Sequence, residues 1–236
     1  MSLVASTGYI FNDISDRVAD SFSPYKKLRP ISSGTVTIIQ GRIVASLCLV
    51  LGLSLSLRIE TSLVFYFLGY FCLVILYTKF FKKNEIVNVV FLTFFYLFRI
   101  VVGGVACSIS ISFWLAMFAF FFFLGLAHLK KKSDFILEDY EIDAASVMVQ
   151  NFFGVAASYL SILILGLYVN DPIVSKSFSQ PRLLWMVIPL LSISNMIVWR
   201  DCFRDKIRTD PVIYFVKNRG IQICLLFCLI LFGLAL

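Results

Sequence analysis

Four side chains with acceptor oxygens follow one another at helical spacing near the start of the chain. Asn12, Asp16 and Asp20 stand at positions i, i+4 and i+8, and Asp13 directly follows Asn12. On a helix such residues form one stripe. The acids in a stripe repel one another unless a cation lies between them, and Mg²⁺ is a hard cation that carboxylates share with phosphates. The pattern predicts Asn12, Asp13, Asp16 and Asp20 as metal ligands; a solvated helix end with scattered acids is the alternative.

A basic turn follows the acids directly. Lys26, Lys27 and Arg29 lie between two prolines, and a glycine closes the segment. One Mg²⁺ cannot neutralise a diphosphate, whereas arginine offers bidentate phosphate contacts and lysine a mobile positive charge. The turn therefore predicts a diphosphate-binding segment. An ordinary positively charged membrane loop explains the charges equally well, although it does not require the prolines and the glycine.

A single arginine interrupts a long apolar segment. Arg99 lies in VFLTFFYLFRIVVGGVA, and a cation inside a membrane span is costly, which makes it a functional hypothesis by default. We expect a catalytic role for Arg99, with pairing to an acid or extension of its side chain toward the membrane surface as alternatives. A further segment, from Lys130 and Lys131 to Asp134, Asp139 and Asp143, mixes both signs and is expected to be a loop.

The composition determines the environment of these residues. Hydrophobic residues make up 60% of the 236 residues, charged residues only 15%, and the mean hydropathy is +0.91. A soluble domain is about 45–50% apolar and about 25% charged. These figures exclude a soluble enzyme and a secreted disulfide scaffold, and they predict an all-α polytopic transmembrane helical bundle in a lipid bilayer. The net charge of +7 then reflects membrane topology, and no nucleic-acid partner is expected.

Seven apolar stretches are long enough to cross a bilayer, and a shorter one, residues 3–11, precedes the acids as a partial first span. The full spans are expected at 36–57, 61–81, 86–107, 110–129, 146–169, 183–203 and 219–236. Sixteen basic residues fall in one set of connections and three in the alternate set. By the positive-inside rule the first set, which holds the acids and the basic turn, is cytoplasmic.

The run GYIFNDISDRVADSFSPYKKLRPISSG resembles the first signature of the UbiA superfamily of intramembrane prenyltransferases, an NDxxDxxxD motif followed by a basic stretch ending in Arg-Pro. Other segments resemble its decaprenyl-phosphate phosphoribosyltransferase-like branch: LYTKFFKK, which aligns Tyr77 and Lys82, LFRIVVGGVACSISISFWL, LKKKSDF and TDPVIYFVKNRG. The resemblance covers nearly the whole chain.

The resemblance implies a transferase that uses a Mg²⁺-bound diphosphate donor, in the branch a phosphoribosyl transfer from phosphoribosyl diphosphate to a polyprenyl phosphate. Transfer of a prenyl group from a polyprenyl diphosphate to an aromatic or lipid acceptor is the alternative, and an inactive fragment of either is another. The residues implied in catalysis are Asp16, Asp20 and Arg99. Those implied in substrate binding are Lys26, Lys27, Arg29, Tyr77, Lys82, Lys130, Lys131, Asp139 and Asp143.

The resemblance also implies the organisation and location of the chain. Residues 1–236 would form a single UbiA-like transmembrane domain that lacks the family's first helix and half of its second, in agreement with the shortened first span. Asp139 and Asp143 have the spacing of the family's second acidic motif, DxxxD. We expect a protein of the bacterial plasma (inner) membrane, with its active site facing the cytoplasm.

Overall fold

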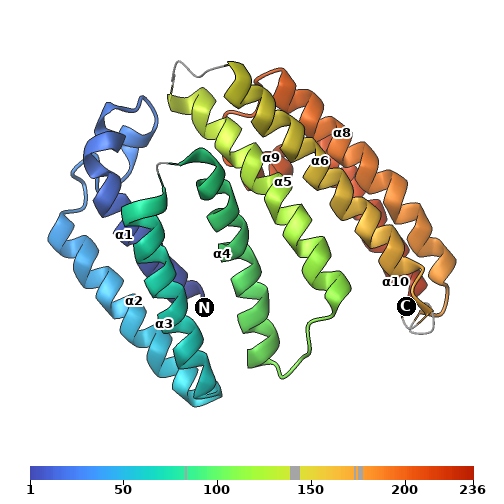
Figure 1. Cartoon of the computed structure of the whole chain (residues 1–236), viewed down its shortest axis with the longest axis horizontal. Helices are drawn as coiled ribbons and strands as arrows, with labels where there is room; N and C mark the ends of the chain where they lie inside the picture. The colour runs from blue at the N-terminus through green and yellow to red at the C-terminus, as the bar shows by residue number, and fades with distance from the viewer. Residues whose placement is uncertain (83, 139–143, 173, 175–177) are drawn as a thin grey trace. The chain divides into compact units, whose positions relative to one another are not determined.

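The computed structural model describes residues 1–82, 84–138, 144–172, 174 and 178–236, and every regular element among them is helical (Figure 1). The described chain divides into two compact units, Met1–Ile111 and Ser112–Leu236. The first unit contains α1 (Ser2–Phe22), α2 (Ile38–Ile59), α3 (Ser62–Leu76) and α4 (Glu85–Ala106). The second contains α5 (Phe113–Glu138), α6 (Ala144–Val169), α8 (Val187–Phe203), α9 (Pro211–Lys217) and α10 (Arg219–Ala235).

Six helical segments of the described chain are long and apolar enough to cross a membrane. They are Ile38–Ile59, Ser62–Phe81, Glu85–Ala106, Phe113–Ile136, Ala145–Val169 and Pro181–Phe203, and each overlaps one of the stretches predicted from the sequence. A seventh span results if α9 and α10, which meet at an angle of 81°, are counted as one broken span. The prediction of an all-α bundle with membrane-spanning helices is confirmed.

The core of the first unit lies where α1 packs against α2 and α3. Val4, Leu63, Phe67 and Tyr70 are among its buried residues. The helices approach closely because Gly52 on α2 faces α1: a Cβ at that position would lie only 2.8 Å from Val4 Cγ2. Such contacts between small residues and neighbouring helices are typical of packing in membranes. The apolar half of α1, including the predicted partial span 3–11, is thereby attached to the rest of the unit.

The second unit is organised around the crossing of α6 with α5 and α8. The indole Nε1 of Trp199 on α8 donates a hydrogen bond to Ser158 Oγ on α6 at 2.8 Å. Gly154, one turn earlier on α6, leaves the space that the Trp199 ring occupies, since a Cβ there would overlap the ring. Leu129, Val198 and Cys202 belong to the same buried cluster as Trp199.

One local prediction is wrong. The sequence predicted a loop from Lys130 onward, but α5 continues through Lys130, Lys131 and Asp134 and ends at Glu138. Lysine is a good helix former, and this turn is also held from outside the helix, because Ser133 Oγ donates to the carbonyl of Thr209 at 2.9 Å.

Candidate functional site

The first signature lies on α1, where Asn12, Asp13, Asp16 and Asp20 form what we call the acid face. Asn12 Nδ2 donates to Asp16 Oδ2 at 2.9 Å, as expected for residues four apart on a helix. Arg29, from the segment after α1, folds back and bridges the other two acids: its Nη1 lies 3.0 Å from Asp13 Oδ1 and 2.9 Å from Asp20 Oδ2. The basic turn therefore returns to the acids that precede it in the chain.

A second cation reaches the acid face from the end of α3. Lys82 Nζ donates to Asn12 Oδ1 at 3.0 Å and also contacts Asp16 Oδ2. A π-helical turn, Tyr77–Phe81, precedes Lys82, whose amide donates to the carbonyl of Tyr77 at 3.0 Å. The wider turn changes the direction in which the following side chain leaves the helix, and π-turns are frequent at functional sites. The acid face is thus contacted by one arginine and one lysine.

Burial raises the free-energy cost of leaving a charge on the acid face without a partner. Asp20 is only 4% exposed, so its charge depends on the contact with Arg29. Burial also raises the pKa of the Asp13 carboxyl above its ordinary value, and the nearby Arg29 guanidinium opposes that rise. Two more carboxylates, Asp20 and Asp16, push the pKa of Asp13 in the same direction as burial does. The acid face therefore attracts positive charge strongly.

The chemistry of the donor set fits Mg²⁺. Three carboxylates and an amide oxygen lie on one helix face, and hard oxygen donors of this kind are the ligands that Mg²⁺ takes together with phosphates. Among the described residues no three His, Cys, Asp or Glu side chains converge on one point, because Arg29 and Lys82 divide the acids between them. The assignment of these four residues as metal ligands stays a prediction.

The other basic residues of the first signature lie in a short 3₁₀ turn, Lys26–Leu28. Lys26 is half-buried, whereas Lys27 is exposed, and the turn follows α1 directly. Tyr77 is buried, and its ring packs against Phe91 and Phe95 on α4 with centroids 5.6 and 5.4 Å away. These contacts anchor the start of the π-helical turn that precedes Lys82. A role for Tyr77 in substrate binding stays a prediction.

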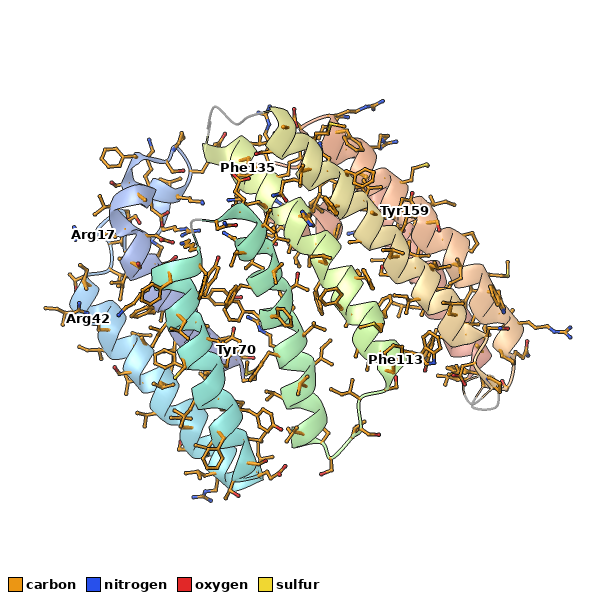
Figure 2. The ribbon with its side chains drawn as sticks, viewed as in Figure 1. Arg17, Arg42, Tyr70, Phe113, Phe135 and Tyr159 are labelled. Atoms are coloured by element: carbon orange, nitrogen blue, oxygen red, sulfur yellow. The ribbon has the colours of Figure 1, made fainter. Side chains whose placement is uncertain are left out.

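Arg99, the predicted catalytic residue within a span, is held by tyrosines. Its Nη2 donates to Tyr9 Oη on α1 at 2.8 Å and lies 3.5 Å from Tyr70 Oη on α3 (Tyr70 is labelled in Figure 2). Its guanidinium carbon also lies 5.8 Å from the ring centroid of Tyr9 and 5.5 Å from that of Tyr96. Arg99 is therefore attached to the same helix that carries the acid face.

The remaining predicted residues lie in the second unit or outside the described chain. Lys130 Nζ is 3.9 Å from Asp210 Oδ2, and Lys131 Nζ lies 4.5 Å from the ring centroid of Phe135. Both have partners within their own unit. Asp139 and Asp143, which carry the predicted second acidic motif, lie outside the described residues.

Sequence reasoning missed three residues with roles in these clusters. Tyr9 precedes Asn12 by three residues and Asp16 by seven, so helical spacing alone would have placed it on the acid face. Tyr70 gave no such signal, since it contacts Arg99 only through the packing of α3. Lys132 is 5% exposed, and its Nζ donates to the carbonyl of Cys202 at 2.7 Å, near the end of α8. The sequence could not predict which of the three consecutive lysines, Lys130, Lys131 and Lys132, is the buried one.

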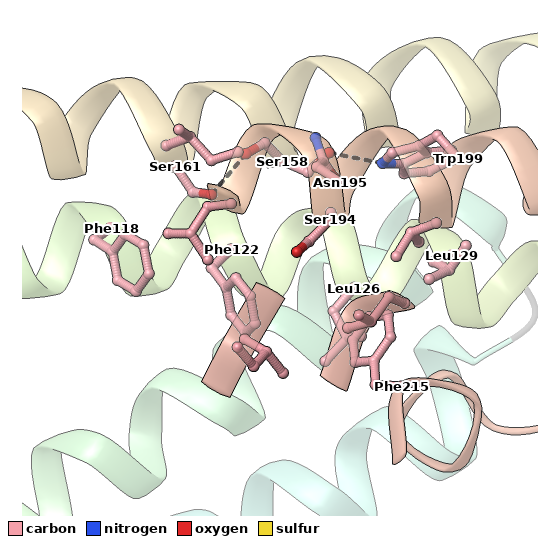
Figure 3. Close-up of a pocket in the computed structure, with 16 residues that line it drawn as sticks. Phe118, Phe122, Leu126, Leu129, Ser158, Ser161, Ser194, Asn195, Trp199 and Phe215 are labelled. Atoms are coloured by element: carbon pink, nitrogen blue, oxygen red, sulfur yellow. Dashed lines mark hydrogen bonds between the residues drawn. The ribbon is translucent and has the colours of Figure 1, made fainter. Parts of the chain in front are cut away.

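The second unit also contains a partly open apolar cavity of ≈ 200 Å³ (Figure 3). Its lining includes Phe118, Phe122 and Leu126 on α5 and Phe215 on α9, together with Ser158 on α6. A cavity of this kind, mostly apolar with few polar groups, suits a hydrocarbon chain or a small apolar group.

Residues 1–218 match the UbiA prenyltransferase family. The chain is 32% identical over 113 residues to a decaprenyl-phosphate phosphoribosyltransferase of Mycobacterium tuberculosis, a match that covers 48% of this chain and 37% of that protein. It is 23% identical over 229 residues to an uncharacterized protein of Sinorhizobium fredii, covering 92% of this chain and 44% of that protein. The matched region thus spans less than half the length of either relative.

A solved structure concerned with the biosynthesis of digeranylgeranylglyceryl phosphate synthase in membranes has a similar fold. The superposition covers 98% of this chain and 77% of that one, with a TM-score of 0.57 and 19% sequence identity. Together with the family match across both units and the helices long enough to span a membrane, these findings show that the chain belongs to the UbiA prenyltransferase family.

Proposed function

We propose that this transferase moves a phosphoribosyl group from phosphoribosyl diphosphate to a polyprenyl phosphate, with Mg²⁺ bound at the acid face. The observation that carries the proposal is the gathering of four acceptor side chains on α1 with Arg29 and Lys82 against them. Such a surface provides oxygen ligands for a metal ion. It also provides cations that can neutralise the part of the diphosphate charge that the metal ion does not. The partial similarity to the mycobacterial phosphoribosyltransferase supports this donor over others.

Asn12, Asp13, Asp16 and Asp20 would hold the metal, which supplies charge neutralisation of the donor diphosphate when bound. Arg29 and Lys82 would then turn from the carboxylates to diphosphate oxygens, with Lys26 and Lys27 beside them. The bond between ribose C1 and the diphosphate oxygen breaks with its electron pair on the diphosphate. An oxygen of the acceptor phosphate then forms the new bond to C1. The protein would contribute to catalysis by positioning the two substrates and by stabilising the negative charge of the leaving diphosphate.

The distribution of charge supports an orientation in the membrane. The acid face and its basic partners belong to the connections that hold sixteen of the chain's basic residues, so we place the site on the cytoplasmic side of a bacterial plasma membrane. Because the family match runs through both units, we treat residues 1–236 as one UbiA-like transmembrane domain. The partners in this proposal are the bilayer, a polyprenyl lipid and a diphosphate-bearing donor.

The test is a comparison of donors with the full chain reconstituted in lipid nanodiscs with Mg²⁺. Labelled phosphoribosyl diphosphate and an unlabelled polyprenyl phosphate should give a labelled lipid product and diphosphate, and the product should disappear when Mg²⁺ is chelated. Absence of labelled lipid at every acceptor length tried, while a polyprenyl diphosphate is consumed, would overturn the phosphoribosyl assignment.

Prenyl transfer is the second candidate, and the family match favours it, because residues 1–218 match a family of prenyltransferases. In this case the acid face would bind a polyprenyl diphosphate, and an allylic cation would alkylate an aromatic or lipid acceptor. A labelled polyprenyl diphosphate would then yield alkylated product, and phosphoribosyl diphosphate would not compete with it.

A further inference from the structure

Arg99 carries a positive charge well inside a membrane-spanning helix. It follows Glu85, the first residue of α4, by fourteen positions, which corresponds to about 21 Å along the helix at 1.5 Å per residue. The hydrocarbon core of a bilayer is about 30 Å thick. Side chains of a helix lean toward its amino terminus, so the guanidinium is directed back toward the end of α4 that begins at Glu85. With Glu85 at the membrane surface, a side chain that starts about 21 Å along the helix would still keep its charge below that surface.

No carboxylate among the described residues forms an ion pair with Arg99. Its hydrogen-bond partners, the hydroxyls of Tyr9 and Tyr70, are neutral. Its Nε is buried and has no acceptor. An intramembrane cation ordinarily pairs with an acid or lines a substrate path, and a buried donor without a partner is costly. Both features call for an anion that supplies acceptor oxygens.

The position of Tyr9 connects this cluster with the acid face. Tyr9 lies seven residues before Asp16 on α1, two helical turns away on the same face and about 10 Å deeper along the helix axis. Tyr9 is 55% exposed in its unit, so the Arg99 cluster is accessible from that side. Arg99 therefore contacts α1 about two helical turns from Asp16, on the side of the helix that carries the acid face.

We propose that Arg99 binds the phosphate of the lipid acceptor, with Tyr9 and Tyr70 holding the guanidinium in place. This inference rests on the proposed function and assigns the second substrate to named residues. The faces of the Tyr9 and Tyr96 rings are already occupied by the guanidinium. A neutral aromatic acceptor would therefore gain little from the cluster, whereas an acceptor phosphate would neutralise the charge and accept from Nε. Arg99 thus selects an anionic lipid.

The experiment measures binding of two lipids that differ only in the phosphate. The full chain, reconstituted in nanodiscs of neutral lipid, is titrated with a polyprenyl phosphate and with the corresponding polyprenol. The wild-type protein should bind the phosphate at least about tenfold more tightly, as expected for a charge-assisted contact. Arg99→Gln should lose this preference, and Arg99→Lys should keep part of it because the charge remains. Tyr70→Phe should weaken it less than Arg99→Gln does.

Arg42→Gln serves as the matched control. Arg42 is an exposed arginine near the start of α2, labelled in Figure 2, and it also lies within a predicted span. This variant should keep the wild-type preference for the phosphate. Equal binding of the two lipids by the wild type, or an unchanged preference in Arg99→Gln, would overturn the inference.

Binding of phosphoribosyl diphosphate with Mg²⁺ is measured in the same variants to separate this inference from the proposed function. Arg99→Gln should bind the donor as the wild type does, which also shows that the variant is folded. If Arg99 binds the lipid phosphate but the wild type neither binds nor uses phosphoribosyl diphosphate, the proposed function fails and the acceptor site stands. If donor binding and transfer proceed while the phosphate preference is independent of Arg99, the acceptor assignment fails alone.

Discussion

At the scale of single residues, the acid face combines four acceptor side chains with two cations drawn from different parts of the chain. Arg29 comes from the segment directly after α1, and Lys82 comes from 66 residues beyond Asp16. These two cations balance two of the three negative charges, and the same side chains are suited to bind phosphate. In the proposed function, the acids and cations that pair with each other in this structure would instead pair with the metal and the donor diphosphate.

The stripe of acids could be predicted from the sequence because it depends only on helical spacing. The contact of Lys82 with Asn12 and Asp16 could not, since it depends on the π-helical turn at Tyr77–Phe81, which changes the direction of the side chains that follow. The contacts of Arg99 with Tyr9 and Tyr70 could not be predicted either, because they join residues far apart in the chain. The chain separations, 90 residues to Tyr9 and 29 to Tyr70, leave no local signal.

Asp13 provides a test of the burial of the acid face. Since burial raises its pKa in the folded protein, the stability that its protonated form contributes is complete below the unfolded pKa, about 3.9, and is lost as pH rises through the folded value. Asp13→Asn stays neutral at every pH. It should therefore melt at a higher temperature than the wild type at neutral pH, and the difference should vanish as pH falls toward 4.

Thermal unfolding in nanodiscs across this pH range measures the effect. If Asp13→Asn melts below the wild type at neutral pH, the contact with Arg29 outweighs the cost of burial, and the electrostatic description of the acid face is wrong.

At the scale of helices, close approaches at glycine decide the packing. The spans were predictable from runs of apolar residues, because length and composition alone define them. The extension of α5 beyond Lys130 and the 81° angle between α9 and α10 were not predictable in this way. The first depends on contacts with the α8–α9 segment, such as that of Ser133 with Thr209. The second occurs at Asn218, whose side chain caps α10 by accepting from the amide of Ile221.

Gly154 on α6 tests the packing of the second unit. A Cβ at this position would overlap the ring of Trp199 and lie 2.8 Å from His128 Cβ. Gly154→Ala should therefore destabilise the unit by about 1–3 kcal/mol, the usual cost of overpacking. The matched control is Gly69→Ala on α3, where an added Cβ meets nothing within 4 Å. That variant should be neutral or slightly stabilising, since alanine favours a helix over glycine. Equal melting temperatures for the two variants would contradict the packing described for the α6–α8 crossing.

At the scale of the whole molecule, the chain belongs to the UbiA prenyltransferase family, and its described helices include six that are long and apolar enough to span a membrane. The family could be predicted from the first signature, because a spaced set of acids followed by a basic Arg-Pro stretch is specific in a membrane protein. The second acidic motif, at Asp139 and Asp143, stays a prediction. Lys130 and Lys131, expected beside it, have partners in the second unit.

The proposed function requires that the acid face binds a diphosphate donor together with Mg²⁺. Isothermal titration of phosphoribosyl diphosphate into the full chain in nanodiscs, with and without Mg²⁺, tests it most directly. The wild type should bind only with Mg²⁺, and Asp16→Asn should reduce the affinity by about tenfold or more, as expected for loss of a charged ligand. Glu60→Gln, which changes an exposed acid at the carboxyl-terminal end of α2, should bind phosphoribosyl diphosphate as the wild type does. Unchanged Mg²⁺-dependent binding in Asp16→Asn would contradict the account.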